Sequence, residues 1–462
     1  MSDELAFMSV AAAVRQIEAG KLAPRELVEA LVERTRELDP LLRSTITLRP
    51  EAADEPIGRG ALGGIPFGVK DCIATAGVRT TANSRLLQDW VPAEDAPAVA
   101  ALRRAGGVLL SKLNLNEFAW AIPGEGDLYP PPRNPWRPET YAMGSSSGAA
   151  VAVASGLVPF ALGTDAGGSI RQPAANCGVA GLKPSHGLVA SAGAFAPPSI
   201  CEVGPIARGV EDLALVLDGL TGADAHSAAL KPAAGRLRIG VLRTYVEAAE
   251  PHPDVMAAFE DALRTFGQIG AEVREVIIEN LGDAAAADFV VLNAEAYALH
   301  ERSLRAHPDR YGSSARLYNA QGAFLSAADY IAANRVGGMV SERVDRALDG
   351  VDVLATPVAP LLTAEAARQA AARPHTGGVA VFTAPFNLTG HPALALPCGI
   401  SGLGVPVGLQ LVGRRGGDAE LLRAGLAYEK ATPWSTRRPQ LATTARAAGA
   451  LQVRLPPRPQ RA

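Results

Sequence analysis

The sequence has few cysteines and few histidines, and neither residue type has the spacing that is typical of metal ligands. Its four cysteines are scattered along 462 residues without a Cys-x-x-Cys pair, and its seven histidines show no ligand spacing. Zinc sites and disulfide frameworks depend on such spacing. We therefore expect no metal, no other cofactor and no disulfide. The cysteines are interpreted as small buried hydrophobic residues in a reducing compartment: Cys72, Cys177, Cys201 and Cys398.

The sequence also lacks a long apolar run and a strong net charge. Its longest apolar run, 149–163, is interrupted by serine, glycine and proline, and a membrane-spanning helix needs about 18 uninterrupted residues. A formal net charge of −3 provides no electrostatic reason to expect nucleic acid or an anionic membrane as partner. Asp3 and Glu4 stand where a secretory signal would be basic. We expect a cytoplasmic protein, monomeric or homodimeric, that acts on a small molecule.

Hydrophobic residues make up 48% of the chain, which is enough for a large core. Helical and β-prone segments also alternate regularly along the sequence. Apolar residues at helical spacing alternate along the chain with short β-prone runs, which favours a layered α/β architecture with a parallel or mixed sheet. The predicted helices cover 5–38, 98–104, 148–155, 253–266, 284–306, 326–348 and 419–430. The predicted strands cover 42–48, 65–69, 108–110, 158–162, 237–242, 272–278, 351–355, 393–397 and 408–412.

The most informative segment is Gly163-Thr164-Asp165-Ala166-Gly167-Gly168-Ser169-Ile170-Arg171. It places a serine at the end of a glycine turn, where consecutive backbone N–H groups can point into one small space. Such a turn can present a nucleophile and stabilise the oxyanion that forms after attack. A serine nucleophile also needs a proton acceptor.

Two upstream segments supply a candidate acceptor. Gly144-Ser145-Ser146-Ser147-Gly148 contributes further serines, and Gly64-Ile65-Pro66-Phe67-Gly68-Val69-Lys70-Asp71 contributes a lysine among apolar residues. Lysine accepts a proton only when it is neutral, and burial lowers its pKa. The apolar neighbours of Lys70 are consistent with such burial.

Together these segments resemble the amidase signature family. The intervals from Lys70 to Ser145 and from Ser145 to Ser169 match the family's usual arrangement. The resemblance covers about 64–429 and includes four more segments, which lie at 176–184, 203–212, 386–393 and 406–413. It departs from the family around the relay serine, where Met143 and Ala149 replace glycine and serine.

The resemblance implies a catalytic triad. Lys70 would be the base, Ser145 would relay the proton from a cis peptide position, and Ser169 would attack the substrate carbonyl. The products would be an acyl-enzyme and a free amine, and water would then release the acid. The oxyanion would be held by four backbone N–H groups, those of Ala166, Gly167, Gly168 and Ser169. Three neighbours, Ser146, Asp165 and Arg171, would support the loops.

The resemblance also implies the fold and the domain organisation. The family fold is an α/β/α sandwich with a large, mixed, mostly parallel central sheet flanked by helices. We expect one amidase domain over 1–432, with N-terminal helices at 5–38, a signature core at about 64–220 and a C-terminal half at about 236–432. The remaining segment, 433–462, is rich in arginine and proline and is expected to be a flexible end.

The substrate is indicated only by composition. We expect loops carrying Trp120, Ile122, Phe195 and Ile200 to line the pocket, and these side chains favour a hydrophobic or aryl amide over glutamine. Carbamates (urethanes) and esters are alternatives, because the same acyl chemistry cleaves them. A further alternative is a glutamine amidotransferase subunit that works within a complex and transfers ammonia.

Two other classes remain to be weighed. Gly144-Ser145-Ser146-Ser147-Gly148 also fits the nucleophile elbow of an α/β-hydrolase esterase with Ser146 as nucleophile. An elbow requires a strand directly before it, whereas 134–143 has the composition of a loop. It would also need a later aspartate and a later histidine, for which His391 is available. His186 offers a separate Ser-His alternative close after Ser169 and is interpreted as pocket wall or core, because Lys70 already supplies a base. A non-catalytic scaffold is disfavoured because all three presumed catalytic residues are present.

Overall fold

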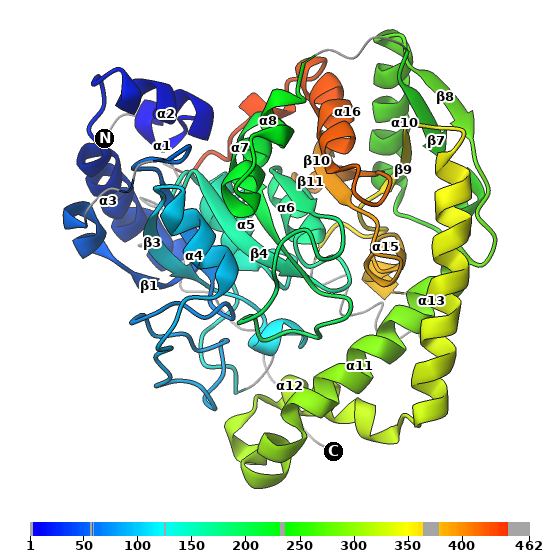
Figure 1. The fold of residues 1–462 in the computed structure, drawn as a ribbon, viewed down its shortest axis with the longest axis horizontal. Helices are drawn as coiled ribbons and strands as arrows, with labels where there is room; N and C mark the ends of the chain where they lie inside the picture. The colour runs from blue at the N-terminus through cyan, green and yellow to red at the C-terminus, as the bar shows by residue number, and fades with distance from the viewer. Residues whose placement is uncertain are drawn as a thin grey trace.

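One mixed β-sheet runs through the protein (Figure 1). The computed structural model describes residues 3–55, 58, 60–123, 126–231, 236–363 and 378–441; of the predicted flexible end, 442–462 lies outside these residues. Within them the sheet has 11 strands in the order β1-β3-β2-β4-β6-β5-β10-β11-β9-β7-β8. Their bounds are β1 Thr45–Leu48, β2 Pro66–Lys70, β3 Val108–Leu113, β4 Phe160–Asp165, β5 Ala180–Lys183, β6 Glu202–Ala207, β7 Arg238–Val241, β8 Glu272–Glu275, β9 Val353–Pro357, β10 Ala393–Ile400 and β11 Pro406–Val412.

Helices pack against this sheet and against one another (Figure 1). Helix α7 contacts α4 and α16, α5 contacts α6, and α10 contacts the strands β8, β9, β10 and β11. The helices are α1 Asp3–Ala6, α2 Val10–Glu18, α3 Pro24–Leu42, α4 Pro97–Arg104, α5 Ser147–Ala154, α6 Arg171–Cys177, α7 Val210–Thr221, α8 Ala225–Ala228, α9 Arg243–Ala248, α10 Pro253–Gln268, α11 Leu281–Ala306, α12 Ser313–Ala320, α13 Ala327–Leu348, α15 Pro385–Leu388 and α16 Asp418–Lys430. This confirms the predicted layered α/β class.

The sheet is mixed, as predicted, but the expectation that it is mostly parallel is wrong. Strand β2 lies parallel to β3 and β4, and β7 lies parallel to β8 and β9. The other six pairings between described strands are antiparallel. The reason is that β10 and β11 form a hairpin, which needs only a short connection, and that β6 runs antiparallel between β4 and β5.

Each helix and strand predicted from the sequence is present, with its ends shifted by a few residues. The N-terminal helices predicted over 5–38 are α1, α2 and α3, which together extend over 3–42. Strands β5 and β6 were not predicted. Their sequences, Ala-Gly-Leu-Lys and Glu-Val-Gly-Pro-Ile-Ala, are short and contain the glycine and proline that are disfavoured in strands, and only pairing with β4 and β10 makes them strands.

Helix α5 is short, small in cross-section and completely buried. It contacts β2, β4 and α6. Gly148 in its first turn is required, because a Cβ atom there would lie 2.5 Å from the backbone of Asn114. The small residues therefore let α5 approach the sheet closely, and its N-terminus brings the serine segment against β2 and β4.

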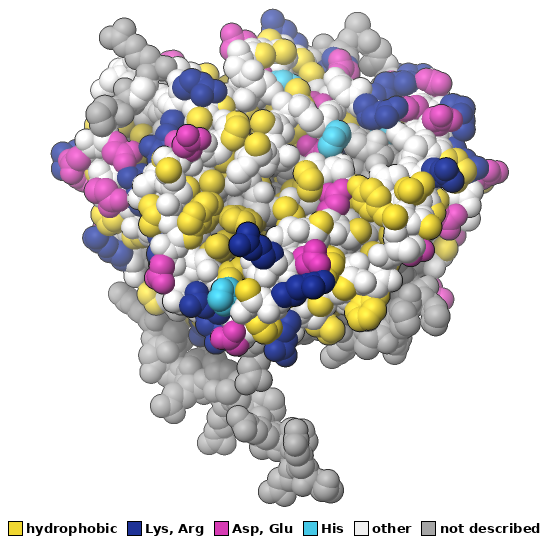
Figure 2. Space-filling view, turned by 60° about the horizontal axis from the view of Figure 1, so that its bottom comes forward, with side chains coloured by type: hydrophobic (Ala, Val, Ile, Leu, Met, Phe, Trp, Pro, Cys, Tyr) yellow, Lys and Arg dark blue, Asp and Glu magenta, His cyan; other side chains and the backbone are white. Residues whose placement is uncertain are grey.

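The helices α11 and α13 pack against each other and form the lower right part of the molecule in Figure 1. Exposed large hydrophobic side chains occur along them and on the connection between them: Leu299, Leu317, Phe324, Ile331 and Met339. Figure 2 shows a face on which hydrophobic and charged side chains are interspersed, and neither sign of charge forms one continuous patch there. Among the described helices, none is both long and apolar enough to cross a membrane.

Candidate active site

Lys70 lies at the end of β2 and is completely buried. Its Nζ donates hydrogen bonds to Ser145 Oγ at 2.8 Å and to Thr164 Oγ1 at 2.7 Å. Burial lowers the pKa of the Lys70 ammonium below its ordinary value, and the opposing electrostatic effect of its neighbours does not cancel this shift. Thr164 was not among the predicted site residues, although it belongs to the glycine-rich segment.

Ser145 precedes α5 and is 3% exposed. The peptide bond between Gly144 and Ser145 is cis, as the resemblance implied. A Cβ atom at Gly144 would lie 2.5 Å from Asn116 Oδ1, so any larger residue here would force the Asn116 side chain to move. The backbone N–H of Asn116 donates to the carbonyl oxygen of Ser145 at 3.3 Å, which ties this segment to the loop after β3.

Ser169 lies half-buried in the turn between β4 and α6. The N–H of Ser146 donates to the carbonyl oxygen of Ser169 at 3.0 Å. The Ser146 hydroxyl donates to the carbonyl oxygen of Thr164 at 3.1 Å and accepts from the Thr164 N–H at 3.3 Å. Ser146 thereby joins the two serine segments, and the structure brings the Lys70–Ser145 pair beside the turn that carries Ser169.

Ser146 does not have the geometry of a nucleophile elbow. It is fully buried, and its hydroxyl is hydrogen-bonded to the backbone of Thr164. No strand stands directly before Gly144 in the described chain. Of the two candidate histidines, His186 contacts Glu202, and His391 contacts Thr389 and Asp345. Neither histidine is hydrogen-bonded to a serine of this segment in the described structure.

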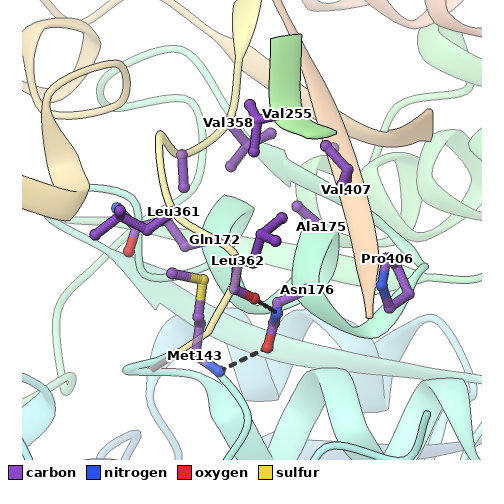
Figure 3. A pocket seen from close by; sticks show the side chains of 12 residues that line it. Met143, Gln172, Ala175, Asn176, Val255, Val358, Leu361, Leu362, Pro406 and Val407 are labelled. Atoms are coloured by element: carbon purple, nitrogen blue, oxygen red, sulfur yellow. Dashed lines mark hydrogen bonds between the residues drawn. The ribbon is translucent and has the colours of Figure 1, made fainter. Parts of the chain in front are cut away.

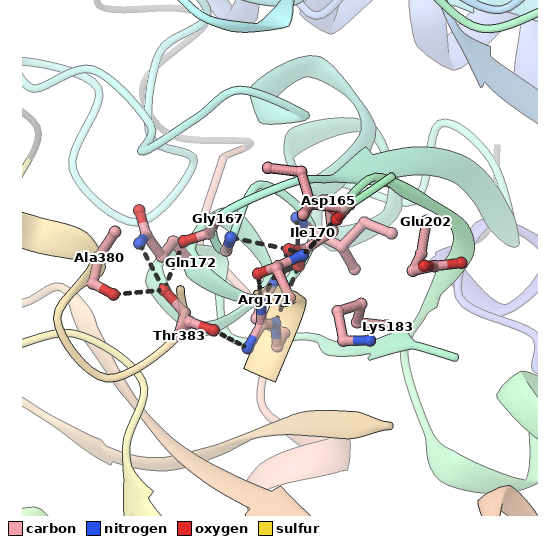
Figure 4. Close-up of polar contacts among 12 residues, drawn as sticks. Asp165, Gly167, Ile170, Arg171, Gln172, Lys183, Glu202, Ala380 and Thr383 are labelled. Atoms are coloured by element: carbon pink, nitrogen blue, oxygen red, sulfur yellow. Dashed lines mark hydrogen bonds and ion pairs between the residues drawn. The ribbon is translucent and has the colours of Figure 1, made fainter. Parts of the chain in front are cut away.

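Asp165 and Arg171 form a completely buried ion pair within the turn (Figure 4). Arg171 Nε lies 2.9 Å from Asp165 Oδ2, and Arg171 Nη2 lies 2.8 Å from Oδ1. Burial by itself would raise the pKa of Asp165. The charge of Arg171 and hydrogen bonds from Arg171 and Asn387 outweigh burial and lower that pKa. The carboxylate is therefore ionised and fixes the turn.

The N–H of Gly168 donates to Asp165 Oδ1 at 2.7 Å, which corrects its expected role as an oxyanion donor. Gly168 has a φ of +125°, and a Cβ atom there would lie 2.3 Å from Thr383 Oγ1. Glycine is thus required by the turn itself. The N–H groups of Ala166, Gly167 and Ser169 remain as candidate donors to an oxyanion.

The sequence analysis missed the residues from the C-terminal half that hold this turn in place. Thr383 Oγ1 donates to the carbonyl oxygen of Gly167 at 2.6 Å, and Asn387 Nδ2 donates to that of Asp165 at 2.7 Å. Arg171 Nη1 donates to Gln410 Oε1 at 2.7 Å and to the carbonyl oxygen of Thr383 at 2.9 Å. Asn387 and Gln410 occur in segments that match the family, but no local pattern in those segments indicates contact with Arg171.

Two of the four predicted pocket residues lie together. Trp120 and Ile200 share an apolar cluster with Ala166 of the turn and with residues of α11, and the Trp120 ring lies 5.7 Å from that of Phe289. Phe195 instead packs on Trp90 and Phe118 in the main core. Ile122 is half-buried and is not part of the Trp120 cluster within the described residues.

A small cavity lies beside α6 and contains none of the three presumed catalytic residues (Figure 3). Its volume is about 20 Å³, room for one water molecule and too little for a substrate. Asn176 closes one side by accepting from the Met143 N–H at 3.1 Å and donating to the carbonyl oxygen of Leu362 at 2.9 Å. In the described chain, no group of three or more His, Cys, Asp or Glu side chains is arranged to bind a metal ion.

Comparison with known proteins agrees with this arrangement. The sequence profile of the amidase family matches residues 26–422. A glutamyl-tRNA(Gln) amidotransferase subunit of Chloroflexus aggregans is 38% identical, over 95% of this chain and 99% of that protein. A solved amidase is 32% identical with a TM-score of 0.82, over 92% of this chain and 99% of the other. The solved structure of the corresponding amidotransferase subunit of Thermotoga maritima is 30% identical with a TM-score of 0.77, over 94% and 96%. The chain belongs to the amidase signature family, whose enzymes act on carbon–nitrogen bonds.

Proposed function

We propose that the protein hydrolyses amides through a covalent acyl-enzyme on Ser169, with Ser145 and Lys70 as the route for the proton. The observation that carries the proposal is the environment of Lys70. This side chain is 0% exposed, contacts the two hydroxyls of Ser145 and Thr164, and has no acidic partner within 4.0 Å in the described structure. A buried lysine without a counter-ion is driven toward its neutral form.

A neutral Lys70 has a free lone pair on Nζ, 2.8 Å from Ser145 Oγ. Ser169 Oγ forms a bond to the substrate carbonyl carbon, its proton passes to Ser145, and the Ser145 proton passes to Lys70. The tetrahedral intermediate then collapses and the C–N bond breaks. The proton returns through Ser145 to the leaving nitrogen, which departs as a neutral amine. Water repeats the sequence on the acyl-enzyme and releases the acid.

The developing negative charge on the carbonyl oxygen needs donors that are already in position. We assign this role to the N–H groups of Ala166, Gly167 and Ser169, because the Gly168 N–H is engaged by Asp165. Each such donor contributes about 10²–10³ in rate. The Asp165–Arg171 pair and Ser146 hold the turn so that these donors need not reorganise during the reaction.

The wall formed by Trp120, Ile200 and Phe289 supports a largely apolar acyl group. Esters and carbamates fit the same chemistry. A second candidate is an ammonia-releasing subunit that works in a complex, because a relative 38% identical over nearly its whole length is named as a subunit of glutamyl-tRNA(Gln) amidotransferase. We propose a monomer or homodimer in a reducing compartment such as the cytoplasm, consistent with four free buried cysteines.

The test is hydrolysis by the purified chain alone. We expect it to release ammonia from primary amides and to form a covalent adduct with a fluorophosphonate at Ser169, which peptide mass spectrometry locates. Glutamine is included with the alkyl amides, aryl amides, esters and carbamates. Turnover of glutamine that arises only after amidotransferase partner proteins are added would favour the second candidate. An unmodified Ser169 with no hydrolysis, both without and with those partners, would refute both candidates.

A further inference from the structure

Asp288 on α11 is an unexplained polar group beside the turn that carries Ser169. Its side chain is 0% exposed, and neither carboxyl oxygen has a hydrogen-bond partner in the described structure. Buried polar atoms are almost always paired, because an unpaired one loses its interactions with water without replacement. Within α11, Asp288 is flanked by Ala287 and Phe289 and stands one turn from Ala284 and Leu292. The helix sequence gives no reason for a carboxyl group there.

The position of the carboxyl group relative to Gly167 points to a ligand. A Cβ atom built on Gly167 would lie 3.6 Å from Asp288 Oδ2. Apart from Gly167 and its two neighbours in the sequence, no other heavy atom of the described residues would lie within 4 Å. Among the described residues, this carboxyl group is therefore the nearest side-chain group to the position over Gly167. The space over Gly168 is filled, since Thr383 Oγ1 would lie 2.3 Å from a Cβ atom there. Asp288 therefore faces the unfilled position beside Gly167, next to the proposed oxyanion donors.

The rest of this wall is apolar. Ala287 and Val291 of α11 pack with Ile200, Ala166 and Trp120. Burial raises the pKa of Asp288 well above its ordinary value; Arg171 and Lys183 oppose this shift, whereas Asp165 and Glu295 add to it. A raised pKa favours the neutral carboxylic acid, which has one O–H donor and one carbonyl acceptor side by side.

We propose that Asp288 determines specificity by binding a second carboxamide or ureide group in the acyl part of the substrate. This inference rests on the proposed amide hydrolysis. A neutral carboxylic acid and an amide complement each other, because each offers one donor and one acceptor in the same plane, so two hydrogen bonds form at once. An alkyl group would leave both carboxyl oxygens unpaired, and an ammonium group would require a charge in an apolar wall.

The experiment compares primary amides that all release ammonia, so that only the acyl part varies. The probes are malonamide, succinamide and glutaramide, each with an alkyl amide, a methyl-ketone amide and an ω-amino amide of matched length. We expect the wild-type kcat/KM for the best diamide to exceed that of its alkyl and ketone analogues by at least about tenfold, the effect of about 1.4 kcal/mol from two net hydrogen bonds.

Two variants test the residue itself. Asp288→Asn keeps one donor and one acceptor in the same shape and should keep the diamide preference. Asp288→Leu removes both and should bring the diamide-to-alkyl ratio to about one. Hydrolysis of the alkyl amide by the leucine variant shows that it is folded; if that variant does not fold, the asparagine variant alone decides, because loss of its diamide preference overturns the proposal.

The remaining outcomes separate this inference from the proposed function. Equal hydrolysis of diamide and alkyl amide by the wild type, or labelling of Ser169 without hydrolysis of any diamide, overturns the role of Asp288 and leaves the acyl-enzyme proposal intact. A preference for the ω-amino amide that Asp288→Asn abolishes shows an ion pair and also overturns it. Absence of both hydrolysis and labelling at Ser169 refutes the underlying function.

Discussion

Replacement of Lys70 by methionine is the sharpest perturbation of the proposed mechanism. Methionine has nearly the length of lysine but cannot accept a proton. A positioned general base contributes about 10²–10⁴ in rate, so we expect Lys70→Met to lower kcat/KM by at least about 10²-fold. The assay is ammonia release from the best primary amide, with fluorophosphonate labelling as a measure of Ser169 reactivity.

The fold should tolerate this change. The variant leaves the hydroxyls of Ser145 and Thr164 without the Nζ atom, at a cost of about 1–3 kcal/mol for a buried polar group left unpaired. It also removes the cost of burying an amine. These terms oppose each other, so we expect a small change in Tm. The loss of activity would then result from the missing base and not from unfolding.

Lys112 provides a matched control in the neighbouring strand. It is also completely buried, but its Nζ donates to the carbonyl oxygen of Ile73 and to the hydroxyls of Thr75 and Thr80, at 2.7–2.9 Å, and lies 3.7 Å from Asp71. Lys112→Met removes these three hydrogen bonds and leaves the Asp71 carboxyl group without its ion-pair partner. We expect a clear drop in Tm, with folded enzyme that still labels at Ser169.

The pH dependence follows from the lowered pKa of Lys70. The base must be neutral, so wild-type kcat/KM should fall as the pH decreases through the folded-state pKa of Lys70. Between that value and the ordinary 10.5, the unfolded chain binds more protons than the folded chain, so stability rises with pH. Lys70→Met should lose the part of the pH-dependent increase in folding stability that comes from Lys70. Retention of more than about one tenth of wild-type kcat/KM by Lys70→Met would refute the assignment of Lys70 as base.

Three further substitutions test the turn. Ser169→Ala should abolish turnover and fluorophosphonate labelling without a change in Tm, and a label on Ser146 in the wild type would instead favour the esterase alternative. Arg171→Met should destabilise the fold by about 3–5 kcal/mol, measured by denaturant unfolding, because it leaves the buried Asp165 carboxylate unpaired; an unchanged midpoint would contradict this. Gly168→Ala should lower kcat by about 10²-fold, because displacing the turn misplaces Ser169 and its donors; wild-type kcat would show that the turn tolerates a Cβ atom.

The sequence by itself determined the order of helices and strands and three of the segments at the site. Periodicity is a local property, so the buried strand that ends at Lys70 and the small-residue helix after Ser146 were visible without a structure. The glycine turn before Ser169 was visible for the same reason, since φ above zero and close approach demand glycine within a few residues.

Only the tertiary structure decided how these segments meet. The contact of Lys70 with Thr164, the engagement of the Gly168 N–H by Asp165 and the support of Arg171 by Gln410 join positions that no local pattern relates. Segment 202–207 forms strand β6, antiparallel to β4, because pairing and packing outweigh its weak intrinsic strand propensity. Asp288 is an ordinary helix residue in the sequence; it becomes a candidate specificity residue only because packing places its unpaired carboxyl group over Gly167, where burial and neighbours set its chemistry.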